Sequence, residues 1–236
     1  MKALSTEEIE FTRKCILENL RVDLRKMNDE RETVFMESTI EQSDGHLHVV
    51  RGETEIEVSI RFIETEETLF TLERIENDTT ESSIAPESSK TLDSSNIESN
   101  EFFLNLIQET LKEFLKNYKI GVKVEAVIFK DDGCVFDLFF LALQKIFSCI
   151  NIPIIENLDR LDIFCDIETS LDLPKPKTYA VYENIFVLDP NKNEELSSDG
   201  IIHLLVDSSK NIHGMFLENS KLIDPLVLIE AINNSV

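Results

Sequence analysis

Apolar and polar residues alternate most strictly in the segment ETEIEVSIRFIE, residues 53–64. Ile56, Val58 and Ile60 are separated by glutamate and serine, so one face is apolar and the other polar. A period of two residues is typical of a strand with one buried and one solvated face. Shorter runs of β-forming residues predict further strands, of which the last four form two hairpins. These runs are 33–40, 46–50, 120–129, 161–167, 179–182, 185–188, 201–206 and 212–217.

Other segments carry apolar residues at helical spacing. Ser5 and Glu8 can satisfy each other's free backbone amides in a capping box, which predicts a helix start. In the segment 136–150 the apolar residues cover so much of the circumference that this helix must be central. Asp224 followed by Pro225 is a well-formed helix start. Helices are predicted at 5–20, 103–115, 136–150 and 224–232.

The mixed order of these elements, with antiparallel pairs and few helices, predicts the α+β class. We expect a single domain over residues 1–236, with one insertion. Residues 76–101 contain seven Ser and seven acidic residues against a single Lys. Because so little apolar surface cannot offset the entropy of ordering, we expect a disordered loop there.

The charge of the chain restricts its partners. There are 46 acidic and 23 basic side chains, giving a net charge of -23, and no long run of Lys or Arg. Such a chain repels a phosphate backbone unless basic partner chains supply the contacts. No stretch is apolar enough for a membrane span, and the N-terminus lacks a signal-peptide core, so we expect a soluble, intracellular protein without membrane contact.

Candidate metal ligands are few. The four cysteines form no CxxC pair, which favours reduced core thiols over a zinc site. His46 and His48 lie on one face of a predicted strand, where they are either paired ligands or exposed strand residues, and the second interpretation is favoured. His203 and His213 lie in the two strands of the last hairpin and could face each other. For them too, exposed strand residues are favoured over paired metal ligands. We expect no cofactor. The cysteines are Cys15, Cys134, Cys149 and Cys165.

Asp137 is a carboxylate inside the most apolar run of the chain. A carboxylate in the first turn of a helix is stabilised by free amides and by the helix dipole. A general acid is the alternative, but no partner lies within sequence reach. We therefore interpret Asp137 as the capping carboxylate of the central helix.

Four sequence elements in this order resemble the RNase PH-like ring subunits of the RNA exosome. They are ENLRVDLR (18–25), DGHLHVVRGETEIEVSI (44–60), DDGCVFDLFFLALQKI (131–146) and YAVYENIFVLDPNKNEELSSDGIIHLLVD (179–207). The resemblance covers about 11–63 and 122–232. Leu24 stands where the family's Arg-x-Asp-Gly-Arg signature has Gly. The matching residues are Arg21, Asp23, Arg25, Asp44, Gly45, Val49, Gly52, Thr54, Asp132, Gly133, Asp137, Asp189, Pro190, Glu194 and Glu195.

The resemblance implies an RNase PH-like fold, related to domain 2 of ribosomal protein S5, with mixed sheets and packed helices. It implies that Arg21 and Arg25 contact RNA or a neighbouring subunit. It also implies structural roles for Gly45, Gly52, Asp132, Gly133, Asp137, Asp189 and Pro190.

Active members of the family carry a GG-T/S-R motif after the central turn, in which the hydroxyl of the Thr or Ser and the Arg bind the attacking phosphate. Here Gly133 is followed by Cys134, Val135 and Phe136, so neither donor is present. The resemblance therefore implies a non-catalytic subunit without phosphate-binding or metal-binding residues. The alternative is a phosphate-dependent 3'-to-5' exoribonuclease, because Asp189 and Glu195 keep the six-residue spacing of the family's two carboxylates. A third interpretation is a generic acidic adaptor protein unrelated to RNA. It would require the agreement in motif order with the family to be a coincidence.

Within the family, the sequence resembles the non-catalytic class of ribosomal RNA-processing proteins, the forty-three type most, then forty-five and forty-two. The resemblance implies a scaffold that supports rRNA maturation and mRNA turnover by other subunits. Its partners would be other RNase PH-like ring subunits, RNA-binding cap subunits and a docked nuclease, and RNA would be met through the complex only. The implied localisation is the nucleus and nucleolus, and also the cytoplasm.

Overall fold

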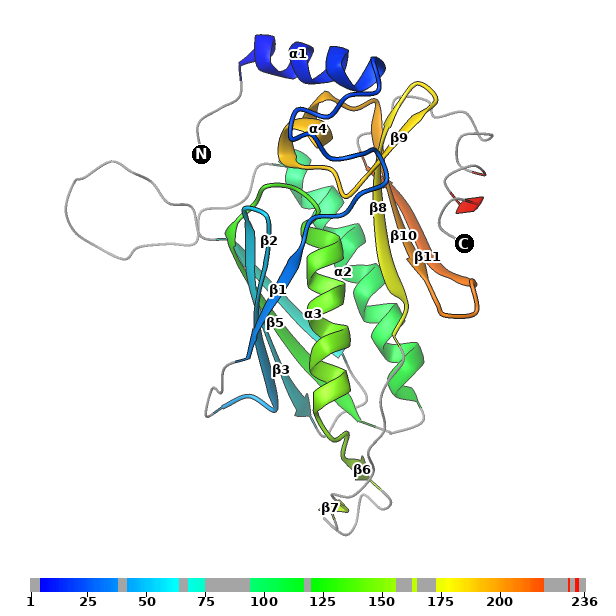
Figure 1. Cartoon of the computed structure of the whole chain (residues 1–236). Helices are drawn as coiled ribbons and strands as arrows, with labels where there is room; N and C mark the ends of the chain where they lie inside the picture. Colours follow the sequence, from blue (N-terminus) through cyan, green and yellow to red (C-terminus); the bar gives the residue numbers. More distant parts are fainter. Residues whose placement is uncertain are drawn as a thin grey trace, which may run out of the picture.

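Two β-sheets flank a central helix in the computed structural model of the chain (Figure 1). The structure describes residues 5–37, 42–63, 68–74, 94–116, 120–155, 163–164, 173–218, 229 and 232–233, with the backbone alone at 94–104, 154–155 and 163–164. The helices are α1 (Thr6–Leu17), α2 (Ser94–Leu115), α3 (Val135–Cys149) and α4 (Lys192–Ser197). The strands are β1 (Thr33–Glu37), β2 (Gly45–Arg51), β3 (Thr54–Ile63), β4 (Thr68–Arg74), β5 (Gly121–Lys130), β6 (Ile154–Ile155), β7 (Ile163–Phe164), β8 (Lys175–Tyr182), β9 (Ile185–Leu188), β10 (Gly200–Val206) and β11 (Ile212–Glu218).

The first sheet has the order β1-β2-β3-β5-β4. Neighbouring strands are antiparallel except for β4, which runs parallel to β5. Along β3 the predicted alternation is confirmed, since Ile56, Val58 and Ile60 are buried between half-exposed polar residues. One face of this sheet therefore lies against the core.

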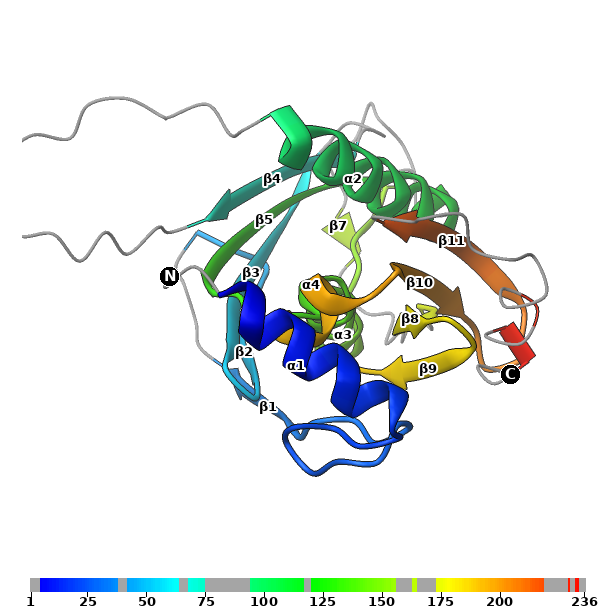
Figure 2. The same cartoon turned by 90° about the horizontal axis from the view of Figure 1, so that it is seen from above.

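The second sheet is antiparallel, with the order β11-β10-β8-β9. Both predicted hairpins are confirmed, β8 with β9 and β10 with β11. Seen from above, α2 lies across the outside of the molecule from β4 to β11, so it spans the gap between the two sheets (Figure 2). The mixed and antiparallel sheets with packed helices confirm the predicted α+β class.

The helix α3 is central, as predicted. It packs against β2 and β3 of the first sheet and against β8 of the second. Its largest side chains, among them Phe139, Phe140 and Phe147, are almost fully buried. Burying aromatic and aliphatic groups on all sides of one helix supplies much of the hydrophobic stabilisation of both sheets.

The helix α1 begins with the predicted capping box. The Glu8 amide donates to Ser5 Oγ at 3.2 Å, and the Ser5 amide donates to the Glu8 carboxylate at 2.9 Å. The helix ends at Leu17, three residues before the predicted end, because Asn19 adopts a left-handed conformation with φ 59°. It packs on α4, and Arg13 forms an ion pair at 2.9 Å with Asp199, which follows that helix.

Several features of the fold differ from the sequence predictions. The strands β4 and β6 and the short helix α4 were not predicted. The prediction of a disordered loop over 76–101 is wrong from Ser94 onward, because α2 starts there. Once a helix has formed, each residue added to its end contributes one hydrogen bond, so the helix can extend into a polar sequence. The rest of that loop, most of the strand at 161–167, and most of the helix at 224–232 lie outside the described residues.

Candidate functional site

The turn at residues 131–133 meets the segment 190–192 at the upper end of the two sheets. The Lys192 amide donates to Asp132 O at 3.1 Å. Gly133 has a φ of +86°, and a Cβ placed there would lie 2.6 Å from Pro190 O. Only glycine allows both this backbone conformation and this approach. The crossing brings the residues before α3 next to those that follow β9.

Asp189 lies at this crossing and is completely buried. Its Oδ2 accepts hydrogen bonds from Arg25 Nη1 at 2.8 Å and from the Arg31 backbone and Nε at 2.7 and 2.9 Å. Its Oδ1 accepts from Arg31 Nη2 at 2.8 Å and lies 3.6 Å from Arg51 Nη1. Three arginines from one end of the chain therefore surround a single carboxylate from the other end.

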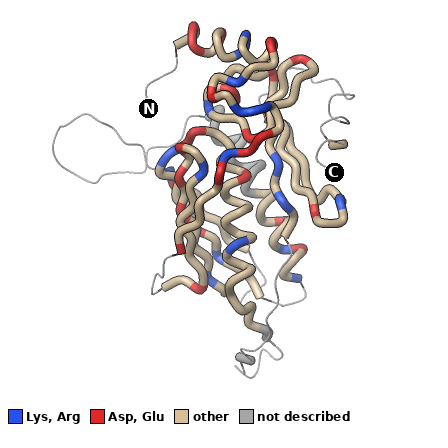
Figure 3. Tube along the Cα trace, in the orientation of Figure 1, with Lys and Arg blue, Asp and Glu red and all other residues tan. Residues whose placement is uncertain are grey.

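Glu194 forms a second buried pair beside Asp189. Arg21 Nε and Nη2 donate to its two carboxylate oxygens at 2.8 and 2.7 Å, which is a bidentate arrangement. The remaining Arg21 hydrogens bond to backbone carbonyls, including those of Leu188 and Asp189. We call Arg21, Arg25, Arg31, Arg51, Asp189 and Glu194 the arginine–carboxylate cluster; Figure 3 shows basic and acidic segments side by side at this end of the molecule.

The cluster shifts the pKa values of Asp189 and Arg31. Burial acts to raise the pKa of Asp189, but the hydrogen bonds and charge of Arg31 and the charge of Arg51 outweigh it, so the pKa lies below its ordinary value. Burial acts to lower the pKa of Arg31, but its hydrogen bonds with Asp189 raise it overall. Asp189 is thus held as an ionised, fully occupied carboxylate, which cannot donate a proton as a general acid.

Glu195 points to the other side of the crossing, into a hollow of about 110 Å³ that we call the acidic hollow. Its Oε2 pairs with Lys192 Nζ at 3.1 Å, and Lys192 also contacts Asp131 Oδ2 at 3.2 Å. Burial raises the pKa of Glu195, opposed mainly by the charge of Lys192. The hollow is lined by Leu72, Arg74, Ile128, Asp131, Val135, Phe136, Lys192, Glu195, His203, Phe216 and Glu218.

The start of α3 forms one wall of the acidic hollow. Cys134 has a left-handed φ of 54°, and its amide donates to Glu195 Oε1 at 2.7 Å. Val135 and Phe136 follow and present aliphatic and aromatic surface to the hollow. These side chains offer no hydrogen-bond donor to an anion, whereas three carboxylates lie opposite.

The prediction that Asp137 caps the central helix is wrong. The helix has Cys134 at its N-cap and no side-chain capping bond there. Instead, Asp137 accepts hydrogen bonds from the Thr178 amide at 3.1 Å and the Thr178 hydroxyl at 2.6 Å, and Arg51 lies 3.9 Å away. The carboxylate is buried and joins α3 to β8, because β8 packs against this face of α3. Burial raises its pKa to about 6.

The histidines also differ from their interpretation as exposed strand residues. His46 and His48 are partly buried and lie next to Glu57 and Glu55 at 2.5 and 3.0 Å.

His203 and His213 do not face each other, because the register of the hairpin places Phe216 opposite His203. His203 is buried and stacks on Phe216 with ring centroids 4.1 Å apart. His213 pairs with Asp207 at 3.0 Å. Within the described residues, no group of three or more His, Cys, Asp or Glu side chains is arranged to hold a metal ion.

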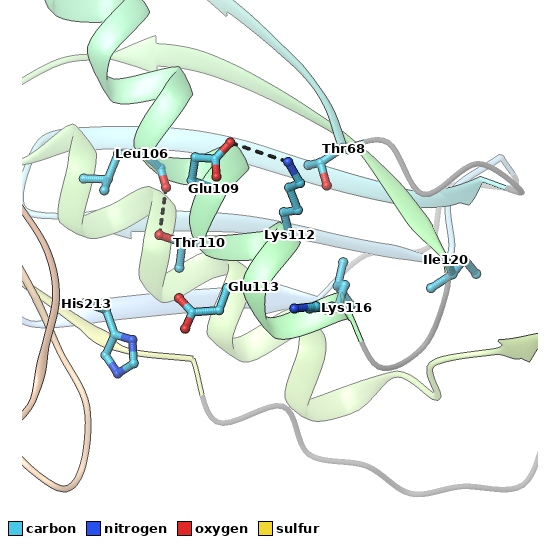
Figure 4. A pocket seen from close by; sticks show the side chains of 10 residues that line it. Thr68, Leu106, Glu109, Thr110, Lys112, Glu113, Lys116, Ile120 and His213 are labelled. Carbon is cyan, nitrogen blue, oxygen red and sulfur yellow. Dashed lines mark hydrogen bonds and ion pairs between the residues drawn. The ribbon is translucent and has the colours of Figure 1, made fainter.

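A larger hollow of about 520 Å³ lies beside α2 (Figure 4). Some of its polar groups are paired within the helix: Thr110 donates to Leu106 O at 2.7 Å, and Lys112 contacts Glu109 at 3.9 Å. Of the residues predicted to form a site, His213 alone is among those that line it. It is therefore a weaker candidate than the acidic hollow.

The other predicted site residues have identifiable positions. Arg21 is buried in the cluster, so it is not available to RNA or to a partner, and Arg25 is largely buried between Asp23 and Asp189. Gly52, with φ +58°, packs under the Arg31 side chain. Gly45, Asp132 and Pro190 contact α3, Lys192 and Arg31 respectively.

Two cluster members, Arg31 and Arg51, were missed by sequence reasoning. The available signal was indirect: in a chain with twice as many acids as bases, several arginines gather before residue 52 without forming a run.

Among the described helices, none is long and apolar enough to cross a membrane.

Comparisons with known proteins agree with this architecture. Residues 173–236 match the family described as "3' exoribonuclease family, domain 2". No curated protein sequence matches the chain. Among solved structures, the chain is similar to one described as the Archaeoglobus fulgidus exosome with RNA bound to the active site, with a TM-score of 0.70, 18% identity, and coverage of 96% of this chain and 92% of that one.

Two further structures are similar. An archaeal exosome core has a TM-score of 0.70 and 18% identity, over 96% of this chain and 91% of that one. Rice (Oryza sativa) Rrp46 has a TM-score of 0.59 and 14% identity, over 91% and 92% of the two chains. At these identities the likeness shows the fold, which is the α+β RNase PH fold.

Proposed function

We propose that this chain is a non-catalytic subunit of the RNase PH-like ring of an RNA exosome, contributing structure to 3'-to-5' RNA processing performed by other subunits. The fold supports this proposal, as do the archaeal exosome structures to which the chain is similar. The ring position that we propose is the forty-three type. Nuclear, nucleolar and cytoplasmic localisation, and partnership with cap subunits and a docked nuclease, belong to the same proposal.

One observation carries the non-catalytic part of the proposal. Asp189, the first of the two candidate catalytic carboxylates, has no exposed surface, and both of its oxygens are occupied by arginine. A carboxylate that is held ionised and shielded from solvent can neither protonate a leaving group nor be reached by substrate. Its contacts with Arg25 and Arg31 tie the segment before β1 to the end of β9.

The alternative, phosphate-dependent exoribonuclease activity, is favoured by one observation. Arg74 and Lys192 bring two cations into the hollow that holds Glu195. Both cations, however, contact the same oxygen of Asp131, at 3.0 and 3.2 Å. With Glu195 and Glu218 also present, an entering phosphate would meet more negative than positive charge, which opposes its binding.

The two functions are distinguished by reconstitution. The purified chain is mixed with the other RNase PH-like ring subunits of its source organism, and ring formation is followed by native mass spectrometry. In parallel, the chain alone and the ring are incubated with a single-stranded RNA with and without inorganic phosphate. We expect incorporation into the ring and no phosphate-dependent shortening by the chain alone. Phosphate-dependent shortening that Glu195→Gln abolishes would establish the alternative, and failure to enter any ring would refute the scaffold function.

A further inference from the structure

The segment from Leu20 to Arg25 is folded with its apolar side outward. Leu20, Val22 and Leu24 have exposed fractions of 60%, 51% and 91%. The two arginines beside them are turned inward: Arg21 is buried, and Arg25 reaches Asp189 inside the cluster, while Asp23 is exposed like its apolar neighbours. This is the inverse of ordinary burial, in which charged groups face water and aliphatic groups face the core.

The outward position of these residues is fixed by the fold. Arg21 donates to both oxygens of Glu194 and to four backbone carbonyls, so the chain on either side of it is tied to the second sheet. The Arg25 amide and Nε both donate to Asp23. A loop held in this way cannot turn its leucines inward without breaking buried ion pairs. We call residues 20–24 the outward apolar loop.

Leu24 is the most exposed large hydrophobic residue in the described part of the chain, and it has a φ of 67°. This left-handed conformation is unfavourable for a residue with a Cβ and free of strain for glycine. In the isolated chain, a leucine at this position neither buries its side chain nor adopts a favourable backbone conformation. Strained backbone conformations are held by the surrounding structure and cluster at functional sites, including sites of binding.

The surroundings of the outward apolar loop indicate the charge of its partner. The exposed acids Glu18, Asp29, Glu30 and Glu32 flank it in the sequence, against the single exposed base Lys26. A second copy of this chain would place an acidic border against an acidic border, in a protein of net charge -23. A partner that borders its apolar surface with lysine or arginine is complementary instead.

Beyond the loop the chain leads into the edge strand β1 (Figure 1). There Val34, Phe35 and Met36 are also exposed, at 48%, 37% and 45%. Because β1 ends its sheet, its outer backbone groups have no neighbouring strand among the described residues. Exposed apolar residues on an edge strand are typical of a surface that another chain covers.

We propose that the outward apolar loop docks into an apolar recess, bordered by basic side chains, on a neighbouring subunit of the ring, with Leu24 as its central contact. The inference rests on the proposed function for the identity of the partner. It assigns a docking role to a residue that occupies a position suited to glycine.

The test uses Leu24→Gly in the full chain. Because glycine is unstrained at this φ, the variant is expected to unfold at the same temperature as the wild type or at a higher one. Wild-type and variant chains are mixed in equal amounts with the recombinant neighbouring ring subunits, and their shares in the assembled ring are read by intact mass. Since burying a leucine is a large part of a local contact, we expect the variant share to fall about tenfold or more.

Lys210→Gly is the matched control. Lys210 has a φ of 69°, and its amide donates to Asp207 O at 3.0 Å, as the Leu24 amide does to Arg21 O at the same distance. It lies in the β10–β11 turn and is charged and exposed, so Lys210→Gly changes the backbone in the same way without removing an apolar contact. Its share in the ring is expected to equal that of the wild type. Leu24→Asn, which also tolerates the left-handed region, is expected to behave as Leu24→Gly does.

Each outcome decides between the two proposals. If the wild type enters the ring and Leu24→Gly competes equally, the docking inference is wrong while the proposed function stands. If the wild type enters no ring, the proposed function is wrong and the partner named here is lost with it. If the chain forms dimers that Leu24→Gly dissociates, the occupant is a second copy, and the basic partner is ruled out.

Discussion

Asp189 and Glu195 stand six residues apart and lie in opposite environments. Asp189 is surrounded by three arginines and has a pKa below its ordinary value, whereas Glu195 faces a small hollow shared with other carboxylates and has a raised pKa. The short helix α4 begins between them and turns the chain, so the two carboxylates point to different sides of one crossing. Sequence spacing that suggests a catalytic pair can therefore join one structural carboxylate and one partly accessible carboxylate.

The largest effect is expected at the arginine–carboxylate cluster. Asp189→Asn removes the charge that Arg25, Arg31 and Arg51 share and leaves buried guanidinium groups without their counterion. We expect the free energy of unfolding to fall by about 3–5 kcal/mol. Urea unfolding followed by circular dichroism measures it. A loss below about 1 kcal/mol would mean that the cluster is not a principal support of the fold.

An intermediate effect is expected at Asp137, which lies next to Arg51 and is buried with a pKa of about 6 against an ordinary value of 3.8. Because the folded pKa is raised, the contribution of this group to stability is complete below about pH 4 and is lost as the pH rises to about 6. The loss is on the order of 3 kcal/mol. Asp189 has the opposite sign, since its contribution is present at neutral pH and is lost as the pH falls below about 4.

Stability curves of the wild type and Asp137→Asn between pH 4 and pH 7 isolate the contribution of Asp137, since that of Asp189 changes only below this range. The variant has no group titrating at this position, so the difference between the two curves is expected to change across the window from about pH 4 to pH 6. A constant difference would show that Asp137 keeps its ordinary pKa in the folded state.

The smallest effect is expected in the acidic hollow. Glu195→Gln keeps an oxygen that can accept the hydrogen bond from the Cys134 amide, and Lys192 keeps its contact with Asp131. We expect the free energy of unfolding to change by about 1 kcal/mol or less. The same urea unfolding experiment compares it with Asp189→Asn, and equal losses would remove the distinction between the two regions.

Much of the fold was predictable because its patterns are local. Alternation identified β3, the capping box identified the start of α1, and the apolar circumference of residues 136–150 identified a central helix. The helix α4 was missed because it has only six residues and too few apolar positions to show a period, although Asn191 and Glu194 form a readable capping box. In β4, exposed Leu69 breaks the simple correspondence between apolar residues and a buried face.

The site was less predictable because its contacts are not local. Asp137 lies in the first turn of α3, and sequence alone favours a local cap there, but Thr178 of β8 offers two donors at once. The roles of Arg31 and Arg51 depend on a carboxylate in the second half of the chain, and no local pattern records that pairing. The family resemblance identified several of the right residues, but not which of them are buried.

The arginine–carboxylate cluster also has a consequence for the order of events during synthesis. Arg21 and Glu194 are separated by 173 positions, and Arg31 and Asp189 by 158. Contacts of such long range close slowly and give the fold a high contact order. While the chain is being translated, the arginines that will be the most deeply buried remain hydrated until residues 189–195 have left the ribosome. The N-terminal segment is made first, and it is among the last parts of the molecule that can be locked in place.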